Sequence, residues 1–125
     1  MEKRSQLHFS SRWDIASNPD TPPETLNEFS NDQDWKIRSA VASNRNTPPE
    51  TLKNLAKDHE WMVRNSVALN PLTPLDTLDE LSNDKNWLVR SNLARNLSTK
   101  IETIMKLVED KKWTVRKSAV ESGRV

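Results

Sequence analysis

Aspartate, tryptophan and arginine are the side chains whose types and spacing could do chemistry here, because they return together every 26 residues. In one copy they are Asp58, Trp61 and Arg64. A guanidinium can bind a carboxylate or a phosphate, and an indole can stack on a nucleic-acid base. Because the acid repeats in step with the base, we expect the pairs to neutralise each other along a stack. This structural ladder comprises Asp32, Asp58, Asp84, Asp110, Trp35, Trp61, Trp87, Trp113, Arg38, Arg64, Arg90 and Arg116.

Other reactive groups are too sparse for a catalytic or metal site. The two histidines, His8 and His59, lie in different copies, and the chain has no cysteine and one glycine. This composition excludes a thiol nucleophile, cysteine-held iron and a glycine-rich phosphate loop. The acidic turn Asp32-Gln33-Asp34 lacks the glycine and closing glutamate of a calcium loop. We therefore predict a protein that is not an enzyme, with no catalytic residue, metal or cofactor.

The first half of each copy has the signals of a short helix. In residues 44–69, Asn44 is predicted to end the preceding helix in a left-handed conformation. Thr47-Pro48-Pro49-Glu50 then reads as a capping box, with a helix of about nine residues beginning at Pro48. Leu52 and Leu55 give this helix its apolar side.

The second half of each copy predicts a longer helix. Asp58 is placed as its N-cap, and the helix runs to about Leu69 with Val63 and Val67 on its buried side. We expect Trp61 and its equivalents to fill space between units. A partly open aromatic ladder is the alternative.

Together these signals predict an all-α solenoid, a single repeat domain over residues 1–125 with no β-sheet. A partial first unit of about residues 9–18 precedes four full repeats at about 19–44, 45–70, 71–96 and 97–122. A horseshoe of β-strands is excluded because no segment alternates apolar and polar residues.

The combined motif resembles the leucine-rich repeat variant family over roughly residues 9–122. The resemblance lies in segments such as Asn70-Pro71-Leu72-Thr73-Pro74, in Leu-x-x-Leu, and in an aspartate followed five and six residues later by Val-Arg. The aspartate and Val-Arg part is also similar to HEAT repeats. The resemblance implies a right-handed superhelix, short helices that are 3₁₀ in some members, and a role in interactions. The iron–sulfur cluster of some members is not carried over, because this chain has no cysteine.

The long helices have an outer arc whose residues vary between copies. We predict that this second-helix face, expected to be concave, binds an unidentified protein or peptide. The predicted partner-binding residues are Trp13, Lys36, Met62, Leu69, Leu88, Arg95 and Lys117.

Two other functions stay open. One is a HEAT-like nucleic-acid binder that uses the tryptophan and arginine ladders, against which the net charge of +1 argues. The other is a self-associating structural protein, a homo-oligomer formed through uncapped ends such as Ile104, Met105, Leu107 and Val108. No membrane contact is expected, since no apolar stretch approaches the roughly 20 residues that span a bilayer. Without a secretory signal at its start, the protein is expected to be cytoplasmic.

Overall fold

Two series of helices alternate along the chain: helices of the long series have nine residues, or seven in one case, and helices of the short series have seven or eight. The computed structural model describes residues 6–125, and within that range it contains nine α-helices and no strand. The long series is α1 (Phe9–Ser17), α3 (Trp35–Ser43), α5 (Trp61–Leu69), α7 (Trp87–Leu93) and α9 (Trp113–Glu121). The short series is α2 (Pro23–Phe29), α4 (Pro49–Leu55), α6 (Leu75–Leu81) and α8 (Ile101–Val108). None of these helices is long and apolar enough to cross a membrane.

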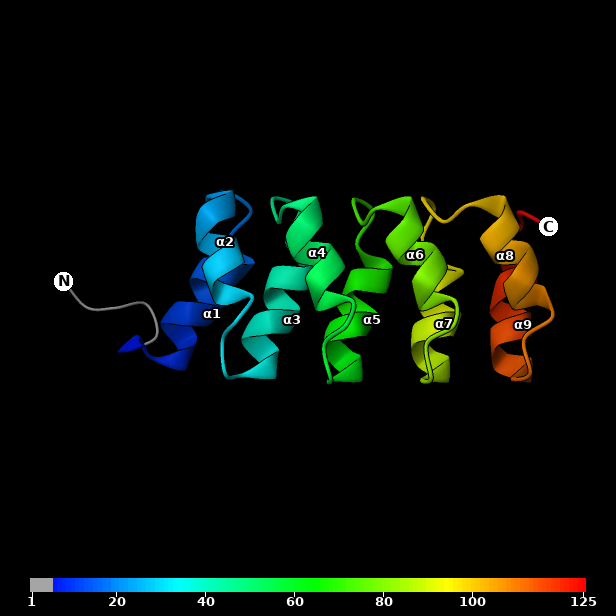
Figure 1. Cartoon of the computed structure of the whole chain (residues 1–125), viewed down its shortest axis with the longest axis horizontal. Helices are drawn as coiled ribbons and strands as arrows, with labels where there is room; N and C mark the ends of the chain where they lie inside the picture. Colours follow the sequence, from blue (N-terminus) through cyan, green and yellow to red (C-terminus); the bar gives the residue numbers. More distant parts are fainter. Residues whose placement is uncertain (1–5) are drawn as a thin grey trace.

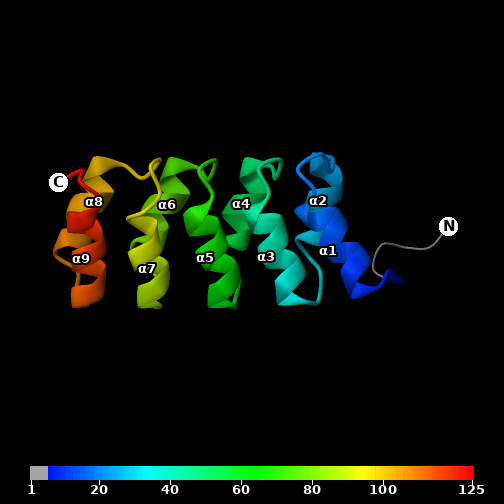
Figure 2. The same ribbon diagram turned by 180° about the vertical axis from the view of Figure 1, so that it is seen from behind.

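The helices form a solenoid in which each unit packs on its neighbours. Figure 1 shows the units side by side in chain order along the longest axis, and Figure 2 shows the same order from behind. Each long helix contacts the next long helix, and α2, α4, α6 and α8 each contact the long helix that follows. The predicted all-α repeat solenoid is therefore confirmed.

Equivalent apolar residues from every unit form one continuous core. In the second full unit, Leu52 and Leu55 of α4 and Val63 and Val67 of α5 are buried, as predicted. Burying a side chain of this kind stabilises the fold by about 1.5–3 kcal/mol. Ala68 is also fully buried and permits close approach of the neighbouring helix.

The predicted start of the short helices is wrong in detail. Pro48 is the N-cap, and α4 begins at Pro49 and has seven residues rather than nine. Thr47 does not cap α4, because its hydroxyl donates to the carbonyl of Val41 at 2.6 Å. Thr47 lies one residue before the N-cap, and its hydroxyl instead donates to a carbonyl that has no partner within α3, near the end of that helix. The short helices are α-helical.

Asn44 ends α3 as expected, but not in the left-handed conformation. Its backbone is extended, with φ −79° and ψ 131°, and the positive φ within residues 6–125 belongs to Gly123. The extended backbone lets the Asn44 amide reach the preceding unit, where it donates to the carbonyls of Ala16 and Asn18 at 2.8 and 2.9 Å. This side chain therefore joins units as well as ending a helix.

Asp58 is not the N-cap of the long helix. That position is Glu60, and Asp58, two residues before this N-cap, accepts the Glu60 backbone N–H at 3.0 Å. The carboxylate therefore lies outside the helix, where it also meets an arginine of the preceding unit.

Candidate functional site

The arginine ladder joins each unit to the next. Arg38 donates from Nε to Asp58 Oδ2 at 2.7 Å and from Nη2 to Asp58 Oδ1 at 3.2 Å. Its Nη1 donates to the carbonyl of Asp32, in its own unit, at 2.8 Å. Equivalent bonds recur in the next two units. Arg64 pairs with Asp84 and also donates to the carbonyl of Asp58, and Arg90 pairs with Asp110 and also donates to the carbonyl of Asp84.

Hydrogen bonding holds the Arg38–Asp58 pair in its charged form against the effect of burial. The hydrogen bond with Asp58 raises the pKa of Arg38 against the opposing effect of burial. Burial alone would raise the pKa of Asp58, but the hydrogen bonds from Arg38 and from the Glu60 amide hold it below its usual value. The guanidinium groups are thus occupied by carboxylates and are not presented to a phosphate.

The two ends of the arginine series differ from the middle. Arg12 is buried and its Nε lies 2.9 Å from Asp32 Oδ2, so it belongs to the ladder. The sequence analysis missed Arg12, although it stands 26 residues before Arg38. Arg116 is exposed and donates to the carbonyl of Asp110 at 2.7 Å, with no carboxylate ion pair within residues 6–125.

A ladder of asparagines forms a second set of bonds between units. Asn70 donates to the carbonyls of Ala42 and Asn44 at 2.9 and 3.2 Å, and Asn96 makes the equivalent bonds at 2.8 and 3.0 Å. The recurrence of asparagine was visible in the sequence, but its reach into the preceding unit was not.

The short helices have a third ladder, which is interrupted once. Thr51 of α4 donates to Asn27 Oδ1 of α2 at 2.7 Å, and an equivalent bond links α6 and α8. Between α4 and α6 the corresponding residues are Thr77 and Lys53. A lysine ammonium has no acceptor, and the buried Thr77 hydroxyl has no hydrogen-bond partner.

The tryptophans lie at the starts of the long helices. Trp35, Trp61 and Trp87 are partly buried and pack against the core. Trp113 is 60% exposed. Lys112 lies over the Trp87 ring, with its Nζ 5.2 Å from the ring centroid. Most indoles are therefore shared between core and surface rather than forming an open stacking platform.

All but one of the predicted partner-binding residues lie on the long helices, and Arg95 follows the end of α7, which is Leu93. These residues do not form one cluster. Trp13 and Leu69 are 42% and 45% exposed, and Met62 and Leu88 are half-buried. The three basic residues of this predicted set, Lys36, Arg95 and Lys117, are exposed. The structure brings Trp13 and Lys36 to the same groove, whereas the Lys117 ammonium lies 3.6 Å from a carboxylate oxygen of Glu121 on its own helix.

Side-chain hydrogen bonds close three of the four junctions between long helices. Ser39 of α3 bonds to Ser66 of α5 at 2.6 Å. Asn92 of α7 donates to Asn65 of α5 at 2.8 Å, and Ser91 of α7 bonds to Ser118 of α9 at 2.6 Å. At the α1–α3 junction the equivalent residues are Trp13 and Ala40, which cannot form such a bond.

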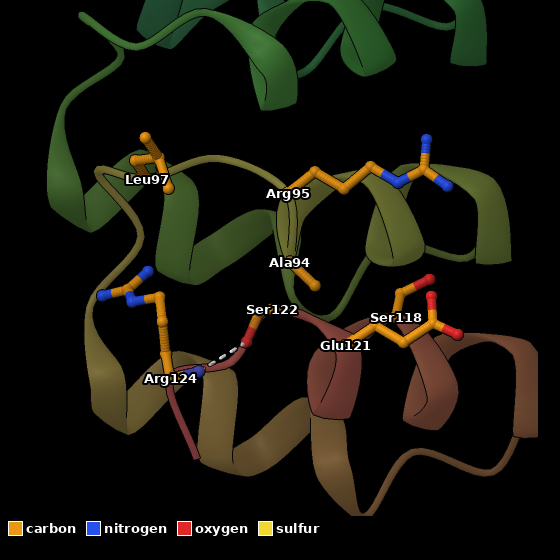
Figure 3. A pocket seen from close by; sticks show the side chains of 7 residues that line it. All are labelled: Ala94, Arg95, Leu97, Ser118, Glu121, Ser122 and Arg124. Carbon is orange, nitrogen blue, oxygen red and sulfur yellow. Dashed lines mark hydrogen bonds between the residues drawn. The ribbon is translucent and has the colours of Figure 1, made fainter.

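A hollow of about 280 Å³ lies between α7 and α9 (Figure 3). Arg95 and Arg124 both line it, but their guanidinium groups point in different directions. They do not converge on one point, so the hollow is not shaped to hold a single anion. No group of three metal-ligating side chains occurs among residues 6–125.

Adjacent loops add apolar surface that the sequence analysis did not include. Leu72 and Leu97 are 57% and 86% exposed. Ser98 donates to the carbonyl of Pro71 at 2.7 Å, which holds the loops carrying these leucines together. Both loops follow long helices, so this surface adjoins the end of α5 near Leu69.

Comparison with solved structures finds a similar repeat protein. No protein-family model matches the sequence, and no curated protein matches it. The structure is similar to a solved structure described as a leucine-rich repeat variant with a novel repetitive protein structural motif, with a TM-score of 0.75 and 28% identity. The match covers 96% of this chain and 47% of the other, so this chain spans about half the length of that protein. The resemblance that the repeated motifs carry is confirmed.

Proposed function

We propose that this chain, which has the repeat fold of the leucine-rich repeat variant, is a non-enzymatic scaffold that binds a protein or peptide through its long helices. The main observation is that two groups of side chains behave differently along the repeat. The repeated asparagines, aspartates and arginines bond to neighbouring units, whereas the outward residues of the long helices differ from unit to unit. A constant frame with a variable surface is typical of repeat proteins that bind other molecules.

The variable surface has the composition of a binding face. Trp13 and Leu69 expose large apolar side chains, and Met62 of α5 and Leu88 of α7 are half-buried. Lys36, at one border, supplies positive charge. Apolar groups at the centre with polar groups around them characterise the core and rim of protein interfaces.

The proposal is tested by replacing Met62, Leu69 and Leu88 together with serine. A matched control replaces Leu75, Ile101 and Met105, which are exposed on short helices. We expect both variants to keep their helical circular dichroism. Affinity capture followed by mass spectrometry should recover the same proteins with the native chain and the control, and lose them with the long-helix variant. Equal recovery with both variants would contradict the proposed face.

Self-association is a second candidate, supported by a different observation. Ile104 and Leu107, which were expected to remain uncovered, are buried inside their own unit. Met105 of α8 is 59% exposed, as expected, and α9 adds Trp113 and Val120, which line a shallow hollow of about 400 Å³. Sedimentation velocity over a concentration series should show a rising weight-average mass if a second copy covers this surface, and Trp113→Ser should abolish the rise.

Nucleic-acid binding has less support in the geometry. The ladder arginines bond to carboxylates, and most indoles are partly buried. A gel-shift experiment at low salt should therefore show no retardation of DNA or RNA at micromolar protein. Retardation that Arg64→Ala abolishes without loss of fold would support the nucleic-acid alternative.

A further inference from the structure

We propose that the groove between α1 and α3 binds an acidic peptide segment, holding a large apolar side chain whose neighbouring carboxylate pairs with Lys36. This inference rests on the long-helix face proposed above and gives that face a specific anchoring point. The partner is therefore defined by its chemistry: an aromatic or long aliphatic residue beside an aspartate or glutamate.

Aromatic rings form the walls of the groove. Phe9 and Trp13 of α1 are stacked, with ring centroids 6.2 Å apart and an angle of 24° between their planes. Trp35, Lys36 and Ser39 of α3 complete a hollow of about 320 Å³. Phe9 and Trp13 remain 40% and 42% exposed. Contact with an apolar side chain would remove this aromatic surface from water.

The hollow continues along the junction of the two helices. Trp13 and Ser39 also line a second cavity of about 180 Å³, which reaches Ser17, Ala40 and Ser43. The two cavities share Trp13 and Ser39, so they lie next to each other along the α1–α3 junction. An extended peptide can lie along this junction, with its anchor residue among the rings and its flanking residues beside the serines.

The open groove follows from a local break in the repeat. At the other three junctions between long helices, a hydrogen bond joins the two facing polar side chains. At the first junction Trp13 faces the short Ala40 side chain, and neither residue can make that bond. The exception to the repeated pattern thus coincides with a hollow lined by three aromatic rings, those of Phe9, Trp13 and Trp35.

The positive charge of Lys36 favours an acidic peptide. The Lys36 ammonium lies 5.8 Å from the Phe9 ring centroid and 5.9 Å from that of Trp35. It forms no ion pair with a carboxylate of residues 6–125. A carboxylate on the ligand would meet a positive charge that no carboxylate of residues 6–125 pairs with, at the edge of an apolar surface, whereas a cationic ligand would be repelled.

The test begins with a library of random 12-residue peptides, displayed on phage and selected on the full chain. We expect selected peptides to combine Leu, Phe or Trp with an adjacent Asp or Glu. In fluorescence anisotropy, Lys36→Gln and Trp13→Ser should each weaken binding at least fivefold, and Lys36→Arg should retain it. Lys112→Gln is the matched control, because Lys112 also lies over an indole but outside the groove.

The location of binding separates this inference from the general function. In ¹H–¹⁵N spectra, the indole signals of Trp13 and Trp35 should shift on titration with a selected peptide, and those of Trp87 and Trp113 should not. Peptides that bind equally well to Lys36→Gln, or that lack an acidic residue, would overturn the groove assignment. Peptides that bind only at Met62 and Leu88 would overturn it while leaving the long-helix face intact. A selection that yields no binding peptide would overturn the groove assignment, whereas the long-helix face would still be tested by affinity capture.

Discussion

Arg64→Ala should be among the most destabilising single substitutions in this chain. The change removes hydrogen bonds of 2.7 and 3.1 Å to the Asp84 carboxylate and one of 2.8 Å to the Asp58 carbonyl. It also leaves Asp84, whose side chain is 6% exposed, with the Asn86 backbone amide as its remaining donor. Breaking a buried ion pair by removing one partner costs about 3–5 kcal/mol. For a chain of this size, such a loss lowers the melting temperature by about 10 °C or more.

The chain contains its own control for this experiment. Arg116 occupies the equivalent position in the last unit, but it is exposed and has no carboxylate partner among the described residues. Arg116→Ala should therefore cost about 1 kcal/mol or less. Thermal unfolding followed by circular dichroism at 222 nm compares the two. If Arg64→Ala is no more costly than Arg116→Ala, the arginine ladder does not stabilise the stack as reasoned here.

A double substitution tests the origin of the cost. Replacing Arg64 and Asp84 together with leucine removes both buried charges, so the loss should be clearly smaller than the sum of the two single losses. Additive losses would show that the two side chains act independently, against the ion-pair explanation.

Three further predictions concern the arginine, short-helix and asparagine ladders in turn. Hydrogen bonds from Arg38 hold the pKa of Asp58 low against the effect of burial, so this pair stabilises the fold fully above the carboxyl's unfolded pKa of about 4. That stability is lost as the pH falls through the lower folded pKa, which urea unfolding between pH 7 and pH 2 should show. Lys53→Asn should give the Thr77 hydroxyl an acceptor and stabilise the fold by about 1 kcal/mol in thermal unfolding. Asn70→Asp removes both amide donors to the preceding unit and should cost about 2–4 kcal/mol in the same assay.

Each of these predictions has a matched comparison. Asp58→Asn should reduce the acid-dependent part of the stability, and an unchanged pH profile would contradict the assignment. Lys57→Asn alters an exposed lysine near the same helix and should leave stability nearly unchanged. Asn46→Asp is the comparison for Asn70, because it loses a single donor, to the carbonyl of Thr21 at 2.7 Å.

The periodicity of the sequence predicts the helices and the core because both depend on local patterns. Leu52 and Val63 recur at helical spacing in every unit, and the structure buries them. Their positions follow from the requirement that each unit cover its apolar residues with its neighbours.

The bonds between units could not be assigned from local signals. Asn44, Thr47 and Asp58 are residues that commonly begin or end helices, and each was assigned such a local role. In the structure Asn44 and Asp58 also bond to the preceding unit, and Thr47 bonds backward to α3. The sequence contains the residue types, but the choice between a local and a neighbouring partner depends on how the units stack.

The α1–α3 groove was only partly visible in the sequence. Trp13 and Lys36 were both predicted to bind a partner, but nothing in their spacing placed them in the same hollow. Their meeting depends on the packing of α1 against α3, and the hollow depends on the small Ala40 side chain beside Trp13.

The regular stacking of the long helices fixes the spacing at which an extended ligand can contact successive units. Packed helices lie about 8–10 Å apart, and an extended chain advances about 3.3 Å per residue. A strand-like peptide crossing the array would therefore bring roughly every third residue opposite a new helix. Each long helix would then contact one residue of a short motif through a different side chain, in the series Trp13, Met62, Leu88 and Lys117. Shifting the motif by one residue would move every ligand side chain away from the helix that it fits.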